Sequence, residues 1–184
     1  MPKSPGLARC GPAPQDAIIV RAASELDMAA VRSIYAHYVL HSLATFEETQ
    51  PTLDEMLARR QASAGSNLPY LVAQAGREIL GFAYAAAYRP RPAYRFTIED
   101  SVYVAEGFGG RGIGSALLGE LIARCERGPW RQMVAIVGDS ANSGSIALQR
   151  RFGFELAGTL RSVGFKHGCW VDTPILQRSL GTAS

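Results

Sequence analysis

The sequence predicts a single domain of the mixed α+β class. The chain has 184 residues, close to the length of one domain, and 47% of them are hydrophobic, enough for a core. Segments with strand-like and helix-like periodicity alternate along it, with no internal repeat and no linker that would divide it. We therefore expect one domain over residues 18–180. The segment over residues 1–17 is rich in Pro and Gly and is expected to be a flexible tail.

Composition excludes several classes of function. The formal net charge is only +3 and the basic residues are scattered, which argues against a nucleic-acid-binding surface. No window reaches about 18 apolar residues, and the tail lacks the apolar run of a secretory signal. Cys10, Cys125 and Cys169 have no short spacing, so neither a disulfide framework nor a metal site is expected. These features together predict a cytoplasmic protein with reduced thiols and no membrane partner.

In the first part of the chain, helices are indicated by their start signals. Ser24 with Asp27, and Thr52 with Glu55, have the spacing of capping boxes. Apolar residues then recur at helical spacing, and Tyr35 and Tyr38 are expected in the core of the first helix. The expected elements are a strand over residues 18–21, a helix to about residue 41, a loop over residues 42–51 and a helix to about residue 60.

The rest of the chain predicts mainly strands around two further helices. Two apolar runs separated by a Gly-containing turn indicate a β-hairpin, and the prolines that follow indicate a loop. The expected elements are strands over residues 70–74 and 79–88, a loop over 89–92, a strand over 96–104, a glycine-rich turn over 106–114, a helix to about 125, a strand over 133–137, a helix over 142–152, and strand-like sequence to about 178.

The glycine-rich turn has the strongest functional pattern in the sequence. Five glycines occupy the eight positions from Gly107 to Gly114, between a strand and a helix. Glycines let backbone N–H groups approach a ligand, and a helix N-terminus favours a phosphate. A plain tight turn is the simpler alternative. The pattern G-x-G-x-x-G also occurs, but the acidic residue expected about 20 positions later is missing, and Ser115 stands where a Walker loop needs Lys.

The residues around this turn resemble the GNAT superfamily of N-acetyltransferases. Residues 110–114 after the strand residues 102–104 are similar to its acetyl-coenzyme A (acetyl-CoA) loop, and residues 142–148 with 152–154 to its next helix and strand. More narrowly, two blocks resemble the phosphinothricin N-acetyltransferase family, and the overall resemblance runs from about residue 18 to residue 180. The blocks are Phe96-Thr97-Ile98-Glu99-Asp100-Ser101-Val102-Tyr103-Val104 and Val163-Gly164-Phe165-Lys166-His167-Gly168-x-Trp170-x-Asp172.

This resemblance implies a mostly antiparallel sheet, flanked by helices, whose two middle strands splay apart to admit acetyl-CoA as the acetyl donor. The backbone of Val102, Tyr103 and Val104 would bond the pantetheine amides, and Asn142 would help to seat the donor. The pyrophosphate would be held by the N–H groups of Gly110, Arg111, Gly112, Ile113, Gly114 and Ser115. No metal is implied, and a homodimer is implied by the resemblance alone.

The resemblance also assigns catalytic roles. Glu99 would be the general base, although by itself a strand carboxylate is more often a solvated surface group. The Val104 N–H would stabilise the oxyanion. Two positions depart from the superfamily pattern: Gly109 stands where Arg or Gln is common, and Gln149 where Tyr or His is common. Gln has no titratable proton, so water or unassisted departure would have to replace the acid.

Substrate contacts are expected from two loops and the central strand. Arg89 and Arg91, on either side of Pro90, could hold an acidic group of the acceptor; the alternative is a pair of solubilising charges. Phe46 and Glu47 correspond to a segment that covers the substrate in the family. On the strand itself, the expected contacts are Glu99, Asp100 and Ser101.

The function predicted is acetyl transfer to the amino group of a small amino-acid-like acceptor, of the phosphinothricin, methionine sulfoximine or methionine sulfone type. Transfer would be direct, in a ternary complex, because Cys125 falls on an apolar helix face. His37 and His41 lack the further ligands of a metal site and are expected to face solvent. Alternatives are an acyl-CoA-binding sensor or interaction module without turnover, and an acetyltransferase for protein N-termini or polyamines.

Overall fold

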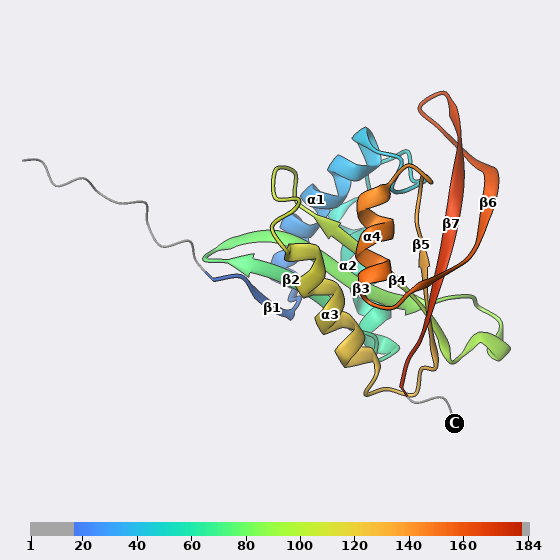
Figure 1. Ribbon diagram of the computed structural model, residues 1–184. Helices are drawn as coiled ribbons and strands as arrows, with labels where there is room; N and C mark the ends of the chain where they lie inside the picture. The colour runs from blue at the N-terminus through green and yellow to red at the C-terminus, as the bar shows by residue number, and fades with distance from the viewer. Residues whose placement is uncertain (1–16, 182–184) are drawn as a thin grey trace, which may run out of the picture.

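A seven-stranded sheet forms the centre of the molecule (Figure 1). The structure, a computed structural model, describes residues 17–181, so all of the expected tail except Ala17 lies outside the described residues. The strand order is β1-β2-β3-β4-β5-β7-β6, and every neighbouring pair is antiparallel except β4 and β5. The strands are β1 (Ile19–Ala22), β2 (Tyr70–Ala75), β3 (Glu78–Ala87), β4 (Thr97–Val104), β5 (Gln132–Ile136), β6 (Glu155–Lys166) and β7 (Cys169–Ser179).

Helices cover both faces of this sheet, which confirms the mixed α+β class. They are α1 (Met28–His41), α2 (Leu53–Gly65), α3 (Ile113–Cys125) and α4 (Ser143–Arg151). Helices α1 and α2 lie on one face, where Met28 and Met56 pack with Phe82 in one buried cluster. Helices α3 and α4 lie on the other face, in front of the sheet in Figure 1, where Leu117 packs with Met133 in a second cluster.

The expected capping boxes form, with two differences in the elements that they start. Asp27 and Ser24 cap a 3₁₀ turn, Glu25–Asp27, which leads into α1. Thr52 and Glu55 cap α2 directly, but that helix continues past its expected end near Arg60. Apolar periodicity fades after Arg60, whereas the alanines that follow have the highest intrinsic helix propensity. The helix thus continues where the hydrophobic pattern alone gives no signal.

The central strands separate as expected. The parallel pairing of β4 with β5 runs from Thr97–Gln132 to Asp100–Ala135. Strand β4 then continues to Val104 alongside β3, while β5 diverges. The gap between the two strands therefore opens just beyond Asp100.

The chain ends in a long hairpin of β6 and β7, which projects beyond the helices in Figure 1. His167 and Gly168 both have positive φ in its turn. Strand β7 lies between β5 and β6, so this hairpin extends the sheet on the side of the gap.

Candidate active site

A cleft of about 560 Å³ lies where β4 and β5 separate. Its walls are the second half of β4, the end of β5, the glycine-rich turn with the start of α3, and helix α4. Nine of the ten residues expected to bind the donor line it: Val102, Tyr103, Val104, Gly110, Gly112, Ile113, Gly114, Ser115 and Asn142. Arg111 does not line this cleft; its guanidinium lies over the ring of Phe108, 4.8 Å from the ring centroid.

The glycine-rich turn leads the chain into α3 through left-handed backbone. Gly107, Gly110 and Gly112 have φ of 78°, 74° and 82°, and Gly112 is the N-cap of α3. The first bond of the helix is from Ala116 N–H to the Gly112 carbonyl. Helix geometry leaves the N–H groups before Ala116 without intrahelical acceptors, and they line the cleft. The turn thus presents unpaired donors at the positive end of a helix dipole, an arrangement suited to a phosphate.

Gly109 differs from these glycines. Its φ lies outside the left-handed region, and a Cβ added to it would meet no atom within 4 Å. Neither the backbone nor the space in the described structure therefore requires glycine at this position. The missing Arg or Gln removes a side chain from the mouth of the cleft without altering the turn.

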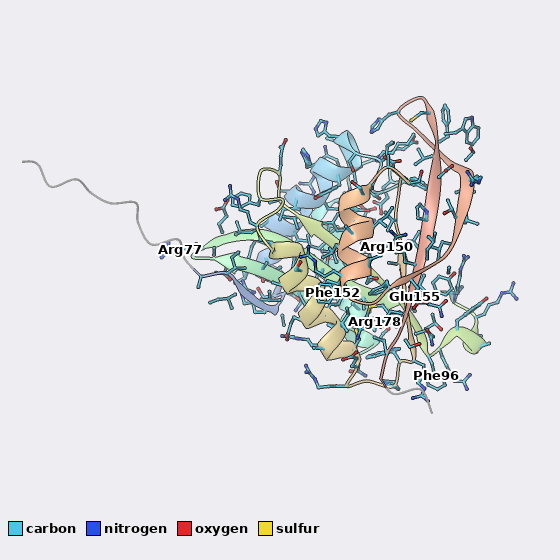
Figure 2. The ribbon with its side chains drawn as sticks, viewed as in Figure 1. Arg77, Phe96, Arg150, Phe152, Glu155 and Arg178 are labelled. Carbon is cyan, nitrogen blue, oxygen red and sulfur yellow. The ribbon has the colours of Figure 1, made fainter. Side chains whose placement is uncertain are left out.

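Helix α4 packs closely against the start of α3. A Cβ on Gly114 would lie 3.3 Å from the Leu148 side chain, so the two helices touch here. Asn142 caps α4 by accepting a hydrogen bond from the Ser145 N–H at 3.1 Å. At the other end of α4, the Phe152 carbonyl accepts a 2.7 Å hydrogen bond from Arg178 on β7, and Figure 2 labels both residues. Both ends of α4 are thereby fixed beside the cleft.

Tyr38 is a site residue that sequence reasoning assigned to the core. Tyr35 is buried as expected, but Tyr38 is only half-buried and lines the cleft. Its hydroxyl donates to the Val104 carbonyl at 2.7 Å and accepts from the Val104 N–H at 3.3 Å. Burial raises the pKa of Tyr38. Helical periodicity is the same for a tyrosine that faces the core and for one that lines the cleft. The sequence alone therefore could not distinguish the two positions.

Neighbouring side chains of β4 project to opposite faces of the sheet. Val102 packs with the cluster under α3, whereas Tyr103 packs with the cluster under α1. By this alternation, Asp100 faces the α3 and α4 side and Glu99 the α1 and α2 side. Burial raises the pKa of Glu99, and the positive charge of Arg89 partly offsets that effect. The structure therefore places Arg89 within electrostatic reach of Glu99.

The loop that contains Arg89, Pro90 and Arg91 is exposed and does not line the cleft. The Arg89 guanidinium lies 5.1 Å from the ring centroid of Tyr88. The Arg91 carbonyl accepts from the Tyr94 N–H at 2.9 Å and starts a short 3₁₀ turn. Of these three expected substrate contacts, only Arg89 has an interaction with another expected site residue.

The loop over residues 42–51 is held in place from two directions. Buried Lys166 on β6 donates from Nζ to the carbonyls of Ser42 and Thr45 at 2.8 and 2.7 Å. Glu47 forms a two-bond ion pair with Arg59 on α2, at 2.8 and 3.1 Å. The loop is thus fixed between α2 and the long hairpin.

Phe46 and the end of β5 show how closely this loop approaches the sheet. A Cβ on Gly164 would lie 2.5 Å from the Phe46 ring, so glycine is needed for Phe46 to dock on β6. A Cβ on Gly138 would collide with the Leu43 carbonyl. Ala44 lies between these contacts and lines the cleft. The loop therefore forms part of the cleft wall.

Asp100 and Gln149 form a buried pair in the cleft wall. Gln149 Nε2 donates to Asp100 Oδ2 at 2.7 Å. Burial raises the pKa of Asp100 to about 7, although the hydrogen bond from Gln149 acts in the opposite direction. The family resemblance predicted a substrate contact at Asp100, but the sequence could not predict its partner on a helix 49 positions later.

Other expected groups are placed without a direct role in the cleft. Cys125 is fully buried, and burial raises the pKa of its thiol to about 12, which makes it a poor nucleophile. His37 lies 3.4 Å from Glu106 and beside His41. Over residues 17–181, no three His, Cys, Asp or Glu side chains are grouped as metal ligands. Within the same range, none of the helices has the length and apolar character needed to span a membrane.

Comparisons with known proteins identify the family. The sequence profile of the acetyltransferase (GNAT) family matches residues 32–154. The chain is 52% identical to a phosphinothricin N-acetyltransferase of Alcaligenes faecalis, over 95% of this chain and 85% of that protein. It is 38% identical to an L-methionine sulfoximine/L-methionine sulfone acetyltransferase of Pseudomonas paraeruginosa, over 88% and 94% of the two chains.

A solved structure agrees with these matches. The crystal structure of a GNAT superfamily phosphinothricin acetyltransferase from Sinorhizobium meliloti, in complex with acetyl-CoA, superposes with a TM-score of 0.86. The two chains are 45% identical, and the match covers 89% of each. The splayed strands, the glycine-rich helix start and these similarities lead to one conclusion: this chain belongs to the acetyltransferase (GNAT) family.

Proposed function

We propose that this protein transfers an acetyl group from acetyl-CoA to the α-amino group of a small amino-acid-like acceptor. Phosphinothricin, methionine sulfoximine and methionine sulfone are the candidate acceptors, since they share an amino-acid head and a tetrahedral polar tail. The observation that carries the proposal is the 52% identity, over 95% of this chain, to a phosphinothricin N-acetyltransferase.

The features of the cleft itself, apart from the similarity to relatives, suit acetyl-CoA. The unpaired N–H groups from Gly110 to Ser115 suit a pyrophosphate, and the exposed edge of β4 from Val102 to Val104 suits the amides of pantetheine. Asn142 lies at the same cleft and fixes the start of α4. When bound, the donor supplies an activated acetyl thioester.

The chemistry on the acceptor side is assigned to Glu99 and Val104. A carboxylate whose pKa is raised by burial can accept the proton of the acceptor's ammonium group, directly or through water. The Val104 N–H would stabilise the oxyanion, and for this the Tyr38 hydroxyl must give up its bond to that group. Transfer would be direct, because the buried Cys125 thiol is not available for an acyl-enzyme.

The acidic groups of the acceptor would be recognised from the loops around Glu99. Arg89, with Pro90 and Arg91, would attract the carboxylate or the phosphinate. Ser101 lies two residues along β4, on the same face as Glu99. Phe46 and Glu47 would cover the acceptor from the loop that Lys166 fixes. Asp100, also expected to contact the substrate, faces the donor cleft instead.

The test is to supply acetyl-CoA with a panel of acceptors and to follow free thiol and acetylated product. The panel contains the three amino acids above, a peptide with a free N-terminus and a polyamine. The expected result is thiol release with at least one of the amino acids and preference for it in competition. Preferred acetylation of the peptide or polyamine would contradict the acceptor class, and binding of acetyl-CoA without thiol release for any acceptor would support a sensor.

We further propose that the protein is a cytoplasmic homodimer that binds neither nucleic acid nor membrane. Support for the dimer is the exposed apolar surface of the β6–β7 hairpin, an unusual surface for a monomer. Its large exposed side chains are Leu156, Leu160, Val163, Phe165 and Trp170. Sedimentation at micromolar concentration would show a dimer, and a monomer there would contradict the proposal.

A further inference from the structure

A buried carboxyl–amide pair lies where the gap between β4 and β5 begins. Only 4% of Asp100 and 6% of Gln149 is exposed, and both residues line the cleft. The neighbours of Asp100 on β3 and β5 are Ala85 and Ala135, which offer no polar side chain. Gln149 Nε2 donates to Asp100 Oδ2 at 2.7 Å and supplies the contact that joins the pair.

Two oxygens of this pair have no donor. Asp100 Oδ1 and Gln149 Oε1 are buried, and neither has a hydrogen-bond partner among the described residues. Buried acceptors without a donor are rare and costly in proteins. A proton on Asp100 Oδ1 would turn one of these two acceptors into a donor, for which the unpartnered amide oxygen of Gln149 would be an acceptor. The geometry thus points to a protonated Asp100.

The pair lies at the closed end of the cleft. Asp100 and Ala135 form the last paired position before the two strands separate. The glycine-rich turn, which suits the pyrophosphate, lies at the other end of the gap, beyond Val104. A donor anchored by its phosphates at that turn would extend its acetyl end inward, toward Asp100.

We propose that Asp100 is the acid that protonates the departing thiolate, and that Gln149 positions its proton. The inference rests on the proposed acetyl transfer and deepens it, but it replaces the oxyanion role proposed for Val104. Four strand residues, about 13 Å, separate Val104 from Asp100, and the oxygen and sulfur of one thioester cannot reach both, so Val104 would contact only the pantetheine arm. The inference also gives a role to Gln149, which cannot itself release a proton but can hold one on its neighbour. Alternation along β4 places this acid and the base, Glu99, on opposite faces of one strand.

Glu99 accepts a proton from the ammonium group of the acceptor, and the free amine forms the new N–C bond with the acetyl carbon. The C–S bond breaks with its electron pair on sulfur, and Asp100 gives its proton to that sulfur. The nitrogen loses its second proton to water, Glu99 releases the proton it accepted to solvent, and Asp100 regains one from solvent. One proton is released for each acetyl group transferred.

The electrostatic surroundings agree with this role. Burial raises the pKa of Asp100 to about 7, Gln149 lowers it and the negative charge of Glu99 raises it further. Among the described residues, Cys125 on α3 also interacts electrostatically with Asp100, and its thiol is neutral because burial raises its own pKa. A general acid is effective when its pKa lies near the working pH.

The first test compares the wild type with Asp100→Asn. Carbon-13 spectra of carboxyl-labelled aspartate in the free protein should show one resonance, absent from the variant, that titrates near pH 7. With any acceptor that the wild type acetylates, the variant should lose about a hundredfold in kcat, keep the KM for acetyl-CoA, and lose the alkaline limb of the rate profile. A carboxyl group already ionised at about pH 5, or an unchanged kcat, would overturn the inference.

A second variant keeps the test decisive if Asp100→Asn does not fold. Gln149→Leu removes every hydrogen bond between the two side chains, so the carbon-13 titration of Asp100 and the alkaline limb of the rate profile should shift together to a new pH. If the alkaline limb of the rate profile stayed at the same pH in this variant, Asp100 would not be the acid. Glu120→Gln, on the outer side of α3, is the surface control. If the wild type acetylated no acceptor, the proposed function would fail, whereas the carbon-13 titration would still decide whether Asp100 holds the proton.

Discussion

Two adjacent side chains on β4 carry the proposed protonation chemistry. Glu99 is enclosed on the α1 and α2 side, where burial raises its pKa, and Arg89 is the positive charge near it. Asp100 is enclosed on the other side with Gln149. Two adjacent carboxyl groups therefore have different surroundings, which allows one to accept a proton and the other to donate one.

Replacing Glu99 by Gln tests the base. The amide has nearly the same shape but cannot accept the proton of the ammonium group, so kcat should fall by about a hundredfold or more. Acetyl-CoA affinity, measured by calorimetry, should stay almost unchanged, because Glu99 faces away from the donor cleft. Turnover equal to that of the wild type would show that another group is the base.

Some contacts between single residues could not be predicted from any local sequence pattern. The sequence indicated Phe46 and Gln149 as positions of interest, but not that Phe46 docks on Gly164 or that Gln149 pairs with Asp100. Local periodicity reports which face of an element is apolar. It does not report which distant side chain completes that face, so these pairs could be found only in the folded chain.

Among the elements, the turn into α3 was the most predictable part of the site. Its clustered glycines indicated a tight turn in which backbone N–H groups can approach a ligand. In the structure, Gly107, Gly110 and Gly112 have positive φ and Gly109 does not. The spacing of the glycines therefore predicted the turn, although not which positions need glycine.

Gly112→Ala tests whether the backbone of this turn holds acetyl-CoA. At a φ of 82° an alanine costs about 1 kcal/mol or more in the free energy of unfolding, and relaxation of the turn would misplace the N–H groups of α3. We expect weaker acetyl-CoA binding by calorimetry together with a lower melting temperature. Gly65→Ala, where φ is not left-handed and a Cβ meets nothing within 4 Å, is the matched control. Equal affinity in the two variants would mean that the turn does not hold the donor.

The junction of β1 and α1 depends on another buried carboxylate. Asp27 accepts two 2.7 Å hydrogen bonds from Arg21, and also bonds to Ser24. The hydrogen bonds from Arg21 hold the pKa of Asp27 well below its usual range. A carboxyl group with a lowered pKa stabilises the fold above its unfolded pKa, about 4, and this contribution is lost as the pH falls further.

Asp27→Asn should therefore destabilise the protein by about 2 kcal/mol at pH 7, measured by denaturant unfolding. The difference from the wild type should shrink as the pH falls from about 4 toward 2, because the wild-type carboxylate is then protonated as well. Arg77→Gln, at the exposed β2–β3 turn labelled in Figure 2, is a surface control. A difference that stays constant over this range would show that the ion pair is not the cause.

At the scale of the whole molecule, the fold class and the order of elements followed from the sequence. The β2–β3 hairpin, the four helices and the splayed β4–β5 pair all form as expected. Local periodicity and turn chemistry determine these elements, and the family resemblance provided the topology. The long β6–β7 hairpin was expected only as strand-like sequence, because its register, with two irregularities, depends on distant pairing.

The sheet explains how distant parts of the chain meet at one site. The gap between β4 and β5 would admit the donor from the α3 and α4 side, while the acceptor would approach Glu99 from the side covered by α1 and α2. Lys166 on β6 fixes the loop from Ser42 to Thr45, which lines the same cleft. The two proposed substrates would therefore meet across a single strand, without a covalent intermediate on the protein.

The most direct test of this account is the fate of a labelled acetyl group. Purified protein is mixed with acetyl-CoA carrying carbon-13 in the acetyl group and with phosphinothricin, methionine sulfoximine or methionine sulfone, and the products are analysed by mass spectrometry. The account predicts one labelled acetyl group on the α-nitrogen of at least one of these acceptors, with one free thiol formed for each, and strongly reduced product with Glu99→Gln. Bound acetyl-CoA that gives no labelled amino acid, or product formed equally well by Glu99→Gln, would contradict it.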